Sequence, residues 1–367
     1  MGNGKHTRHL IRSCRTFPKT CWSVRGCAGL LVFSSFLFSA GLAAQLAEKD
    51  CIDSPIEGYE ARFPALGTLV EIRVFSADEE LVSRTVEAAK LRSKAIEDTL
   101  TDYDPDSEAS LLTKVAAGDG FVQVSPDLWN MLAASERWYK LSGGAFDASL
   151  GSLTQKWRAS RRNKKPVSEG QLQQALERSG WRHVQLNFDT KTVRFKRDGI
   201  HLDFGAIGKG YVVDELFKLF HEAGLKQCLV NISGNCRFGD PPPDRDGWRV
   251  EIAPLEKGQP ILRRLLLKNT SIATSGDLWQ FTVIDGERHS HILDPRSGRS
   301  VRGPIAATII APSAADADAC ATAMCVLGPL DGAMLLQSLP EMEGLILEHS
   351  DSRFPVRYIA TEGFAHR

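Results

Sequence analysis

A series of short apolar segments, separated by turn residues, fills the second half of this chain and restricts the folds open to it. Turn chemistry is clearest at Asp240–Gly247, which contains a run of prolines, and at Asp285-Gly286. Helical periodicity is confined to other stretches. Separate runs of helices and mostly antiparallel strands indicate an α+β fold rather than a doubly wound sheet. The predicted strands are 68–75, 184–188, 192–196, 200–204, 227–232, 248–253, 261–267, 280–284, 288–293 and 305–310.

The predicted helices have recognisable starts and ends. Apolar spacing predicts a long helix over 81–100. Ser125 suits an N-cap and Pro126 a first helical position, so a second helix is expected over 126–141. A helix over 314–327 is expected to end at Gly328-Pro329.

The first 44 residues contain six basic side chains and no acidic one. An apolar run over 28–42 and the small residues Ala43-Ala44 complete the architecture of a secretory signal peptide. The run also approaches the length of a membrane span, so an uncleaved N-terminal anchor is the alternative. Basic residues before the run would export everything after it. We therefore predict an exported, periplasmic protein with a signal peptide or anchor at 1–44 and a linker at 45–60.

The charge of the remaining chain excludes one class of partner. The whole sequence has 45 basic and 45 acidic residues, which leaves 39 basic against 45 acidic once the first 44 residues are set aside. A net negative charge is a poor match to nucleic acid, so no nucleic-acid partner is expected. The one basic cluster, 156–165, is predicted to be a solvated surface segment.

The segment Leu202–Asp214 is the strongest functional signal from the residues themselves. It is interpreted as a strand ending in an acid, a loop with glycines and Lys209, and a helix that begins near Tyr211. Glycines let backbone approach an anion, and helix N–H groups with a lysine supply positive charge. The spacing matches neither a Walker A loop nor a dinucleotide fingerprint. The segment therefore indicates a phosphate ligand of unstated identity, against the alternative that its glycines only shape a turn.

A second signal lies in the helix predicted over 314–327. Asp318 and Thr322 are four residues apart, so both oxygens share one helix face among small neighbours. A carboxylate and a hydroxyl suit a hard cation, Mg²⁺ before Zn²⁺. The alternatives are that Asp316 and Asp318 favour the helix N-terminus and that Thr322 bonds back to a carbonyl.

Further polar segments lie at the ends of predicted elements, where sites are usually built. They are Ala65–Thr68, Tyr103–Glu108, Ser142–Asp147, Ala273–Asp277 and His289–Pro295.

Taken in order, these segments resemble the bacterial FAD:protein FMN transferase family, formerly called thiamine-biosynthesis lipoproteins. The similarity runs from about Arg62 to about Leu347, most of the chain after the first 44 residues. Its most specific blocks are Leu202–Asp214, Thr274–Asp277, Ser290–Gly298 and Ala317–Gly328.

The resemblance implies an α+β domain related to the T-fold over 61–350, followed by a C-terminal tail at 351–367. It implies binding of FAD and Mg²⁺, and transfer of FMN through a phosphoester to a Ser or Thr of a partner protein with release of AMP. Asp318, Thr322 and the backbone carbonyl of Ala206 then correspond to magnesium ligands, and His291 to the catalytic base. The implied FAD contacts are Leu66, Tyr103, Ala145, Phe146, Asp147, Asp203, Lys209, Thr274, Ser275 and Ile292.

Two departures and two alternatives accompany this interpretation. Many relatives carry methionine where Leu66 stands, and this chain has no clear copy of the family's acceptor motif. The expected partner is therefore another exported protein, such as an electron-transfer protein, with membrane association through the N-terminus. A Mg²⁺-dependent FAD pyrophosphatase would use the same site with water in place of the hydroxyl. A non-enzymatic flavin-binding protein would need neither metal nor base.

Overall fold

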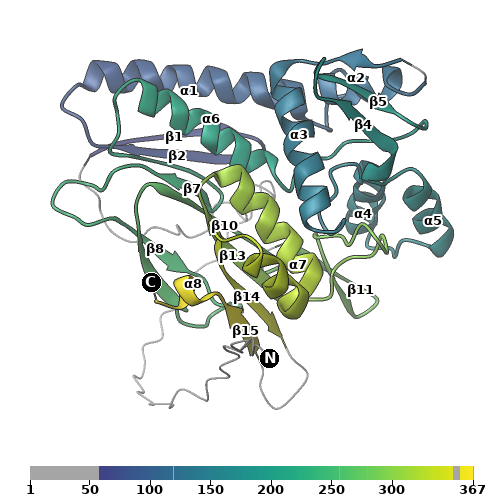
Figure 1. Cartoon of the computed structure of the whole chain (residues 1–367). Helices are drawn as coiled ribbons and strands as arrows, with labels where there is room; N and C mark the ends of the chain where they lie inside the picture. Colours follow the sequence, from purple (N-terminus) through teal and green to yellow (C-terminus); the bar gives the residue numbers. More distant parts are fainter. Residues whose placement is uncertain (1–57, 119, 256, 279, 350–355, 367) are drawn as a thin grey trace, which may run out of the picture. The chain divides into compact units, whose positions relative to one another are not determined.

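Strands that bury both of their faces form the centre of the protein. A computed structural model describes residues 58–118, 120–255, 257–278, 280–349 and 356–366, which belong to one unit of the chain. The predicted signal or anchor and most of the predicted linker lie outside the described residues. The predicted α+β class is confirmed, because helices pack on an antiparallel sheet (Figure 1).

The main sheet has eight strands in the order β1-β2-β6-β7-β10-β13-β14-β15, and every neighbouring pair is antiparallel. Alternate residues face two separate hydrophobic clusters: Val230 and Ile309 join the larger one, whereas Leu229 and Ile310 join the smaller one. The strands are β1 Tyr59–Ala65, β2 Thr68–Val74, β6 Cys228–Ile232, β7 Asn235–Phe238, β10 Thr270–Gly276, β13 Ile305–Ala311, β14 Glu343–His349 and β15 Val356–Ala360.

Each face of the sheet has its own cover (Figure 1). Helices α1 (Glu79–Leu100), α6 (Gly208–Glu222) and α7 (Ala314–Gln337) contribute to the larger cluster. The hairpin β8 (Trp248–Ile252) and β9 (Arg263–Leu267), with α8 (Glu362–His366), contributes to the smaller one. Among the described helices only α7 is long and apolar enough to cross a membrane, yet it packs against the sheet as a core helix.

The remaining helices and strands lie outside the main sheet. A small sheet has the order β3-β5-β4, and β11 pairs with β12. These elements are α2 Glu108–Val115, β3 Val122–Gln123, α3 Pro126–Leu141, α4 Gly151–Asn163, α5 Glu169–Glu177, β4 Val184–Asn187, β5 Thr192–Phe195, β11 Phe281–Ile284 and β12 Glu287–Ser290.

Helices α6 and α7 touch at their N-terminal ends. A Cβ atom built on Gly210 would lie 2.2 Å from the carbonyl oxygen of Ala314, so only glycine allows this approach. Asp214 accepts the N–H groups of Ala314 and Ala315 at 2.9 and 3.0 Å. These contacts satisfy helix-end donors that would otherwise lack partners and hold the start of α6 against the start of α7.

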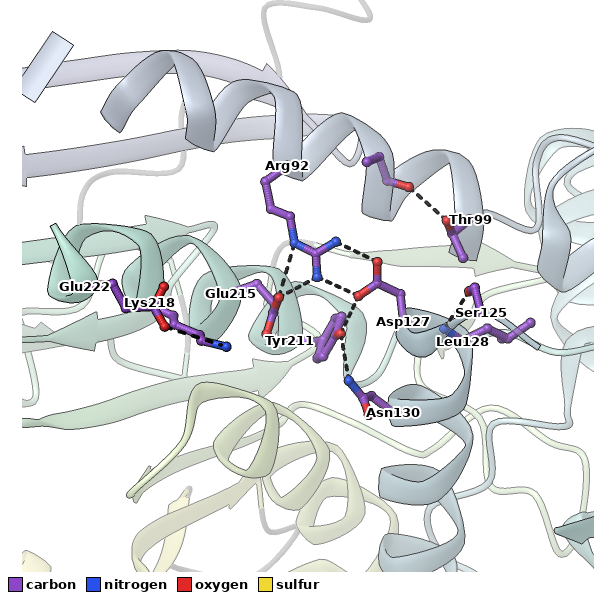
Figure 2. Close-up of polar contacts among 11 residues, drawn as sticks. Arg92, Thr99, Ser125, Asp127, Leu128, Asn130, Tyr211, Glu215, Lys218 and Glu222 are labelled. Atoms are coloured by element: carbon purple, nitrogen blue, oxygen red, sulfur yellow. Dashed lines mark hydrogen bonds and ion pairs between the residues drawn. The ribbon is translucent and has the colours of Figure 1, made fainter. Parts of the chain in front are cut away.

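A polar network holds the rest of α6 (Figure 2). Arg92 of α1 makes two hydrogen bonds of 2.6 Å to Asp127 of α3, and its Nε donates to Glu215 of α6 at 3.1 Å. Tyr211 of α6 donates to Asp127 at 2.6 Å. A bidentate arginine–carboxylate pair has a specific geometry, so the network fixes how α1, α3 and α6 lie relative to one another.

Several predicted elements agree with the structure, notably α3 and most strands, whereas others differ. Residues 200–204 form no strand; His201 makes a single bridge to Leu150, and the chain then enters the turn before α6. The basic cluster 156–165 lies largely in α4, where Arg158 makes two ion pairs rather than facing solvent alone. The predicted helix 314–327 does end at Gly328, with φ 75° and ψ 179°, but a second helical segment follows to the end of α7.

The C-terminal segment is folded onto the main sheet, and two cysteines lie within neighbouring strands of that sheet. Within the expected tail, β15 pairs with β14, and α8 buries Phe364 completely. Cys236 lies opposite Asn231 and donates its thiol to that side chain, and it forms no disulfide with Cys228.

Gly210→Ala should destabilise the protein, because the added methyl group overlaps the backbone of Ala314. We expect the free energy of unfolding to fall by about 1–3 kcal/mol, measured by denaturant titration. Gly170→Ala in α5 is the matched control, since its Cβ would meet nothing within 4 Å. That change should leave stability equal or raise it by up to about 1 kcal/mol. Equal stability in both variants would contradict the close approach.

Candidate active site

The turn before α6 places a lysine beside a buried carboxylate. Helix α6 begins at Gly208 with no side-chain cap from its N-cap residue, Ile207, and the Gly208 N–H donates to the carbonyl oxygen of Phe204 at 2.7 Å. Lys209 Nζ donates to the carbonyl oxygen of Gly205 at 3.2 Å and lies 3.8 Å from Asp318 Oδ2. Gly210 N–H donates to the same oxygen at 3.1 Å. The predicted phosphate loop and the predicted metal helix therefore meet at one point.

Asp318 is buried at 3% exposure. Burial raises the pKa of this carboxyl, against the opposing charge of Lys209 and the hydrogen bond from Gly210. Asp316, the other acidic residue near the start of α7, has different partners: it accepts Trp138 Nε1–H at 2.9 Å and pairs with Arg137. Asp318 is therefore the acid that faces α6.

Thr322 completes this face of α7. Its Oγ1 lies 2.9 Å from Ser275 Oγ on β10, so the hydroxyl faces β10 rather than bonding back along its own helix. Thr274, the neighbour of Ser275, shares a 2.9 Å hydrogen bond with Thr308 of β13. The sequence-predicted residues Ser275, Asp318 and Thr322 thus lie on the α7 side of β10, whereas Thr274 alternates to the opposite face of the sheet.

A third group of contacts lies at the start of the same turn. Asp203 Oδ1 accepts Gly205 N–H at 2.8 Å, and Arg158 donates to Asp203 Oδ2 at 3.2 Å. The Arg158 guanidinium lies 4.3 Å from the ring centre of Tyr103, whose side chain is 78% exposed. Arg158 also pairs with Asp102. A continuous chain of contacts therefore joins Tyr103 and Asp203 to the group around Lys209.

His291 follows β12 and has a defined tautomer. Its Nδ1 lies 3.1 Å from the carbonyl oxygen of Gln280, so Nδ1 carries the proton and Nε2 keeps its lone pair. Burial, with the charges of Lys209 and Arg161, lowers the pKa of His291 to about 4, against the opposing hydrogen bond to Gln280. The neutral imidazole, the form that accepts a proton, therefore predominates at neutral pH.

Other predicted residues have structural contacts of their own. Asp147 is buried and accepts the N–H groups of Ser149 and Trp181 at 2.7 and 2.9 Å, and its pKa is raised by burial. Ala145, Phe146 and Ile292 are all at most 5% exposed. Their roles as FAD contacts stay predictions.

Leu66 lies in the two-residue turn between β1 and β2. Both Leu66 and Gly67 have positive φ, 54° and 68°, as a type I′ hairpin requires. This backbone is uncommon for leucine, and its role as an FAD contact also stays a prediction.

The oxygen donors around Asp318 fit a hard cation. Within the described residues no group of three His, Cys, Asp or Glu side chains is placed to hold a metal. A site here would therefore use one carboxylate, the Thr322 hydroxyl and the Ala206 carbonyl, which lies in the turn before α6. Few protein ligands leave positions for phosphate oxygens, which suits Mg²⁺.

Sequence reasoning missed Arg158 and Arg161. Both were placed in a solvated cluster because consecutive basic residues usually are solvated. The buried residues around Trp157 recur with helical spacing, and this pattern could have identified the segment as a helix, α4, rather than a loop.

Solved structures share this α+β fold. The flavin transferase ApbE from Vibrio cholerae has a TM-score of 0.76 at 24% identity, covering 85% of this chain and 99% of that one. The ApbE protein from Thermotoga maritima has a TM-score of 0.75 at 27% identity, covering 84% and 98%. The fold therefore places the chain in the class of ApbE-fold domains.

Sequence comparison identifies the family. The ApbE family profile matches residues 66–346, so the chain belongs to the ApbE family. An FAD:protein FMN transferase from Treponema pallidum is 29% identical over 309 residues, covering 80% of this chain and 85% of that protein. Another from Vibrio cholerae is 26% identical, covering 85% and 94%.

The depressed pKa of His291 has a direct test. Its imidazole should stay neutral, with the proton on Nδ1, as the pH falls from 7 to about 5, and should titrate only near a pKa of about 4, as read from long-range ¹H–¹⁵N NMR correlations. The signals that disappear in the His291→Asn variant are assigned to the His291 imidazole. Titration near the ordinary value of about 6.5, or a proton on Nε2, would contradict the geometry.

Proposed function

We propose that this chain transfers FMN from FAD to a Ser or Thr hydroxyl of an exported acceptor protein, through a phosphoester bond and with release of AMP. The observation that carries this proposal is that the lysine-containing start of α6 meets Asp318 of α7, one helical turn before Thr322, whose hydroxyl contacts Ser275 of β10. ApbE family membership and relatives named FAD:protein FMN transferase support the same reaction. The basic and apolar N-terminal segment supports a periplasmic location, with or without an anchor in the membrane.

The start of α6 would bind the pyrophosphate of FAD. Lys209 supplies a positive charge, and the start of α6 adds the positive end of the helix dipole. Ser275 adds a hydroxyl group at the neighbouring strand. Phosphoryl transfer needs positioning and neutralisation of charge more than covalent work by the protein, and these residues provide both.

His291 would take the proton of the acceptor hydroxyl. Gln280 holds the ring through Nδ1–H, which directs the unprotonated Nε2 away from that carbonyl. The acceptor oxygen then forms its bond to the FMN-side phosphorus, and the bond to the AMP phosphate oxygen breaks. Because the neutral imidazole is required, activity should be present above the pKa of His291 and be lost as pH falls through it.

Asp318, Thr322 and the Ala206 carbonyl would hold magnesium. When bound, Mg²⁺ would neutralise negative charge on the pyrophosphate oxygens. Lys209 lies beside Asp318, so the same lysine would balance both the carboxylate and the phosphates.

The central experiment incubates the purified protein with FAD, Mg²⁺ and an acceptor domain that carries the family's Ser/Thr motif. Mass spectrometry should detect one added FMN on that Ser or Thr, with AMP released, and EDTA should abolish the product. Free FMN and AMP without an adduct would instead indicate a pyrophosphatase. Intact bound FAD without turnover would indicate a flavin-binding protein.

Two substitutions separate metal binding from base catalysis. Asp318→Asn should abolish Mg²⁺-dependent transfer, because it removes the only carboxylate assigned to the metal. His291→Asn should lower kcat by about 10²–10⁴-fold while the Kd for FAD changes little, because general-base catalysis contributes about that much. Retained transfer by Asp318→Asn contradicts the metal site, and a large loss of FAD affinity in His291→Asn makes that residue a binding group.

A further inference from the structure

Asp277, directly after β10, is a fully buried carboxylate that the proposed mechanism does not use. The residue is 0% exposed. Its Oδ1 accepts the N–H group of Ile305 at 3.0 Å, and its own N–H group donates to the Ile305 carbonyl oxygen at 3.2 Å. A Cβ atom built on Gly303 would lie 2.0 Å from Asp277 Oδ2, so the backbone at Gly303 closes over the carboxylate. Asp277 is therefore fixed to the start of β13.

Arg288 of β12 supplies the opposite charge. Its Nε donates to Asp277 Oδ2 at 3.0 Å, and its Nη2 donates to the backbone carbonyl oxygen of Asp277 at 2.6 Å. The guanidinium also lies 3.5 Å from the centre of the Phe281 ring on β11, which limits its freedom to rotate. One arginine thus holds both the side chain and the main chain of Asp277. An ion pair with hydrogen bonds of this kind has a specific geometry.

The hairpin formed by β11 and β12 is attached to its surroundings through side chains. In the part of the chain that the structure describes, these two strands pair with each other and with no strand of the main sheet. Backbone hydrogen bonds therefore set the shape of the hairpin without attaching it to β10. Arg288 makes that attachment from one face of β12, while His289 on the other face has its ring centre 5.3 Å from that of Trp157.

The same hairpin carries the proposed base. His291 follows β12, and both its backbone N–H and its Nδ1 lie 3.1 Å from the carbonyl oxygen of Gln280, which precedes β11. The imidazole is thus fixed to the hairpin rather than to the main sheet. Ser275 of β10 contacts Thr322 of the proposed magnesium site at 2.9 Å. The ion pair at the end of β10 therefore links the element that carries the base to the strand that faces the metal.

We propose that Asp277 and Arg288 form a positioning pair, which holds the His291 imidazole in place relative to Ser275 and Thr322. This inference rests on the function proposed above and adds two residues that act through the base rather than by touching FAD or the acceptor. A general base must lie within hydrogen-bonding reach of the proton that it takes. A displacement of about 1 Å costs about 10²-fold in rate, so the pair controls kcat without contributing to binding.

The test replaces both partners at once, because removing one alone would leave a buried charge uncompensated. The double variant Asp277→Asn with Arg288→Met removes both charges at similar side-chain volume. With FAD, Mg²⁺ and the acceptor domain, mass spectrometry of the FMN adduct should show kcat lowered by about 10- to 100-fold. The Kd for FAD and the KM for the acceptor should change little. Arg288→Lys keeps the charge and one donor, so its kcat should lie between those of the double variant and the unsubstituted protein.

The second hairpin, β8–β9, offers a matched control. Arg264 Nε lies 2.7 Å from Glu251 Oε1, and this pair joins two strands that cover the opposite face of the main sheet. Glu251→Gln with Arg264→Met removes an arginine–carboxylate pair of the same kind and should leave kcat unchanged. Equal losses of kcat in the two double variants would show a general loss of structure and overturn the specific role.

Two further readouts separate the position of the base from its chemistry. In the ligand-free protein, amide hydrogen exchange in β11 and β12 should be faster in the Asp277→Asn, Arg288→Met variant, with exchange in β8 and β9 unchanged. The His291 proton should stay on Nδ1 in the NMR correlations, because Gln280 belongs to the same hairpin. A proton on Nε2 in that variant would show that the pair acts on the tautomer instead, which overturns the positioning role.

The remaining outcomes are distinct. A lower kcat with unchanged FAD affinity, an unchanged tautomer and faster exchange in the hairpin supports the assignment. A raised KM for the acceptor at unchanged kcat, or a kcat for Arg288→Lys as low as that of the double variant, overturns it. If the unsubstituted protein forms no FMN adduct, the proposed function fails and the positioning role fails with it. If that protein forms the adduct and the double variant matches it, only the role of the pair fails.

Discussion

The close approach of α6 to α7 is the contact on which the site depends. Gly210 brings the first turn of α6 against the backbone of Ala314, and Asp214 ties the same two helices through the first N–H groups of α7. With this geometry Lys209 lies beside Asp318, although more than a hundred residues separate them in the sequence. The anchoring of α6 by Arg92 and Asp127 keeps that end in place from the opposite side.

Burial of the Asp318 carboxylate dominates the electrostatics of the site. Asp318 is buried with one backbone donor and with Lys209 at 3.8 Å, which is little compensation for a carboxylate. In the proposed function a cation at Asp318 would supply further compensation, so its binding would stabilise the folded protein.

Local signals predicted several regular elements, missed β1, β7, β10, β14 and β15 of the main sheet, and found the site only in pieces. Ser125 and Pro126 marked the start of α3, and Gly328 marked the break in α7, because capping and backbone freedom act over a few residues. Residues 200–204 looked like a strand from their apolar content, yet they find no ladder partner beyond one bridge. The cluster around Arg158 looked like a solvated loop because its ion-pair partners, Asp102 and Asp203, are far away in the sequence.

The sequence by itself determined the α+β class, the glycine-rich turn before α6 and the pairing of Asp318 with Thr322 on one helix face, since these follow from periodicity and short-range geometry. The resemblance carried by its ordered motifs extended this to a family. Only the tertiary structure decided that Asp318 rather than Asp316 faces Lys209, and that Gln280 selects the tautomer of His291. The physical reason is that burial and partner choice arise from long-range packing, which no local pattern encodes.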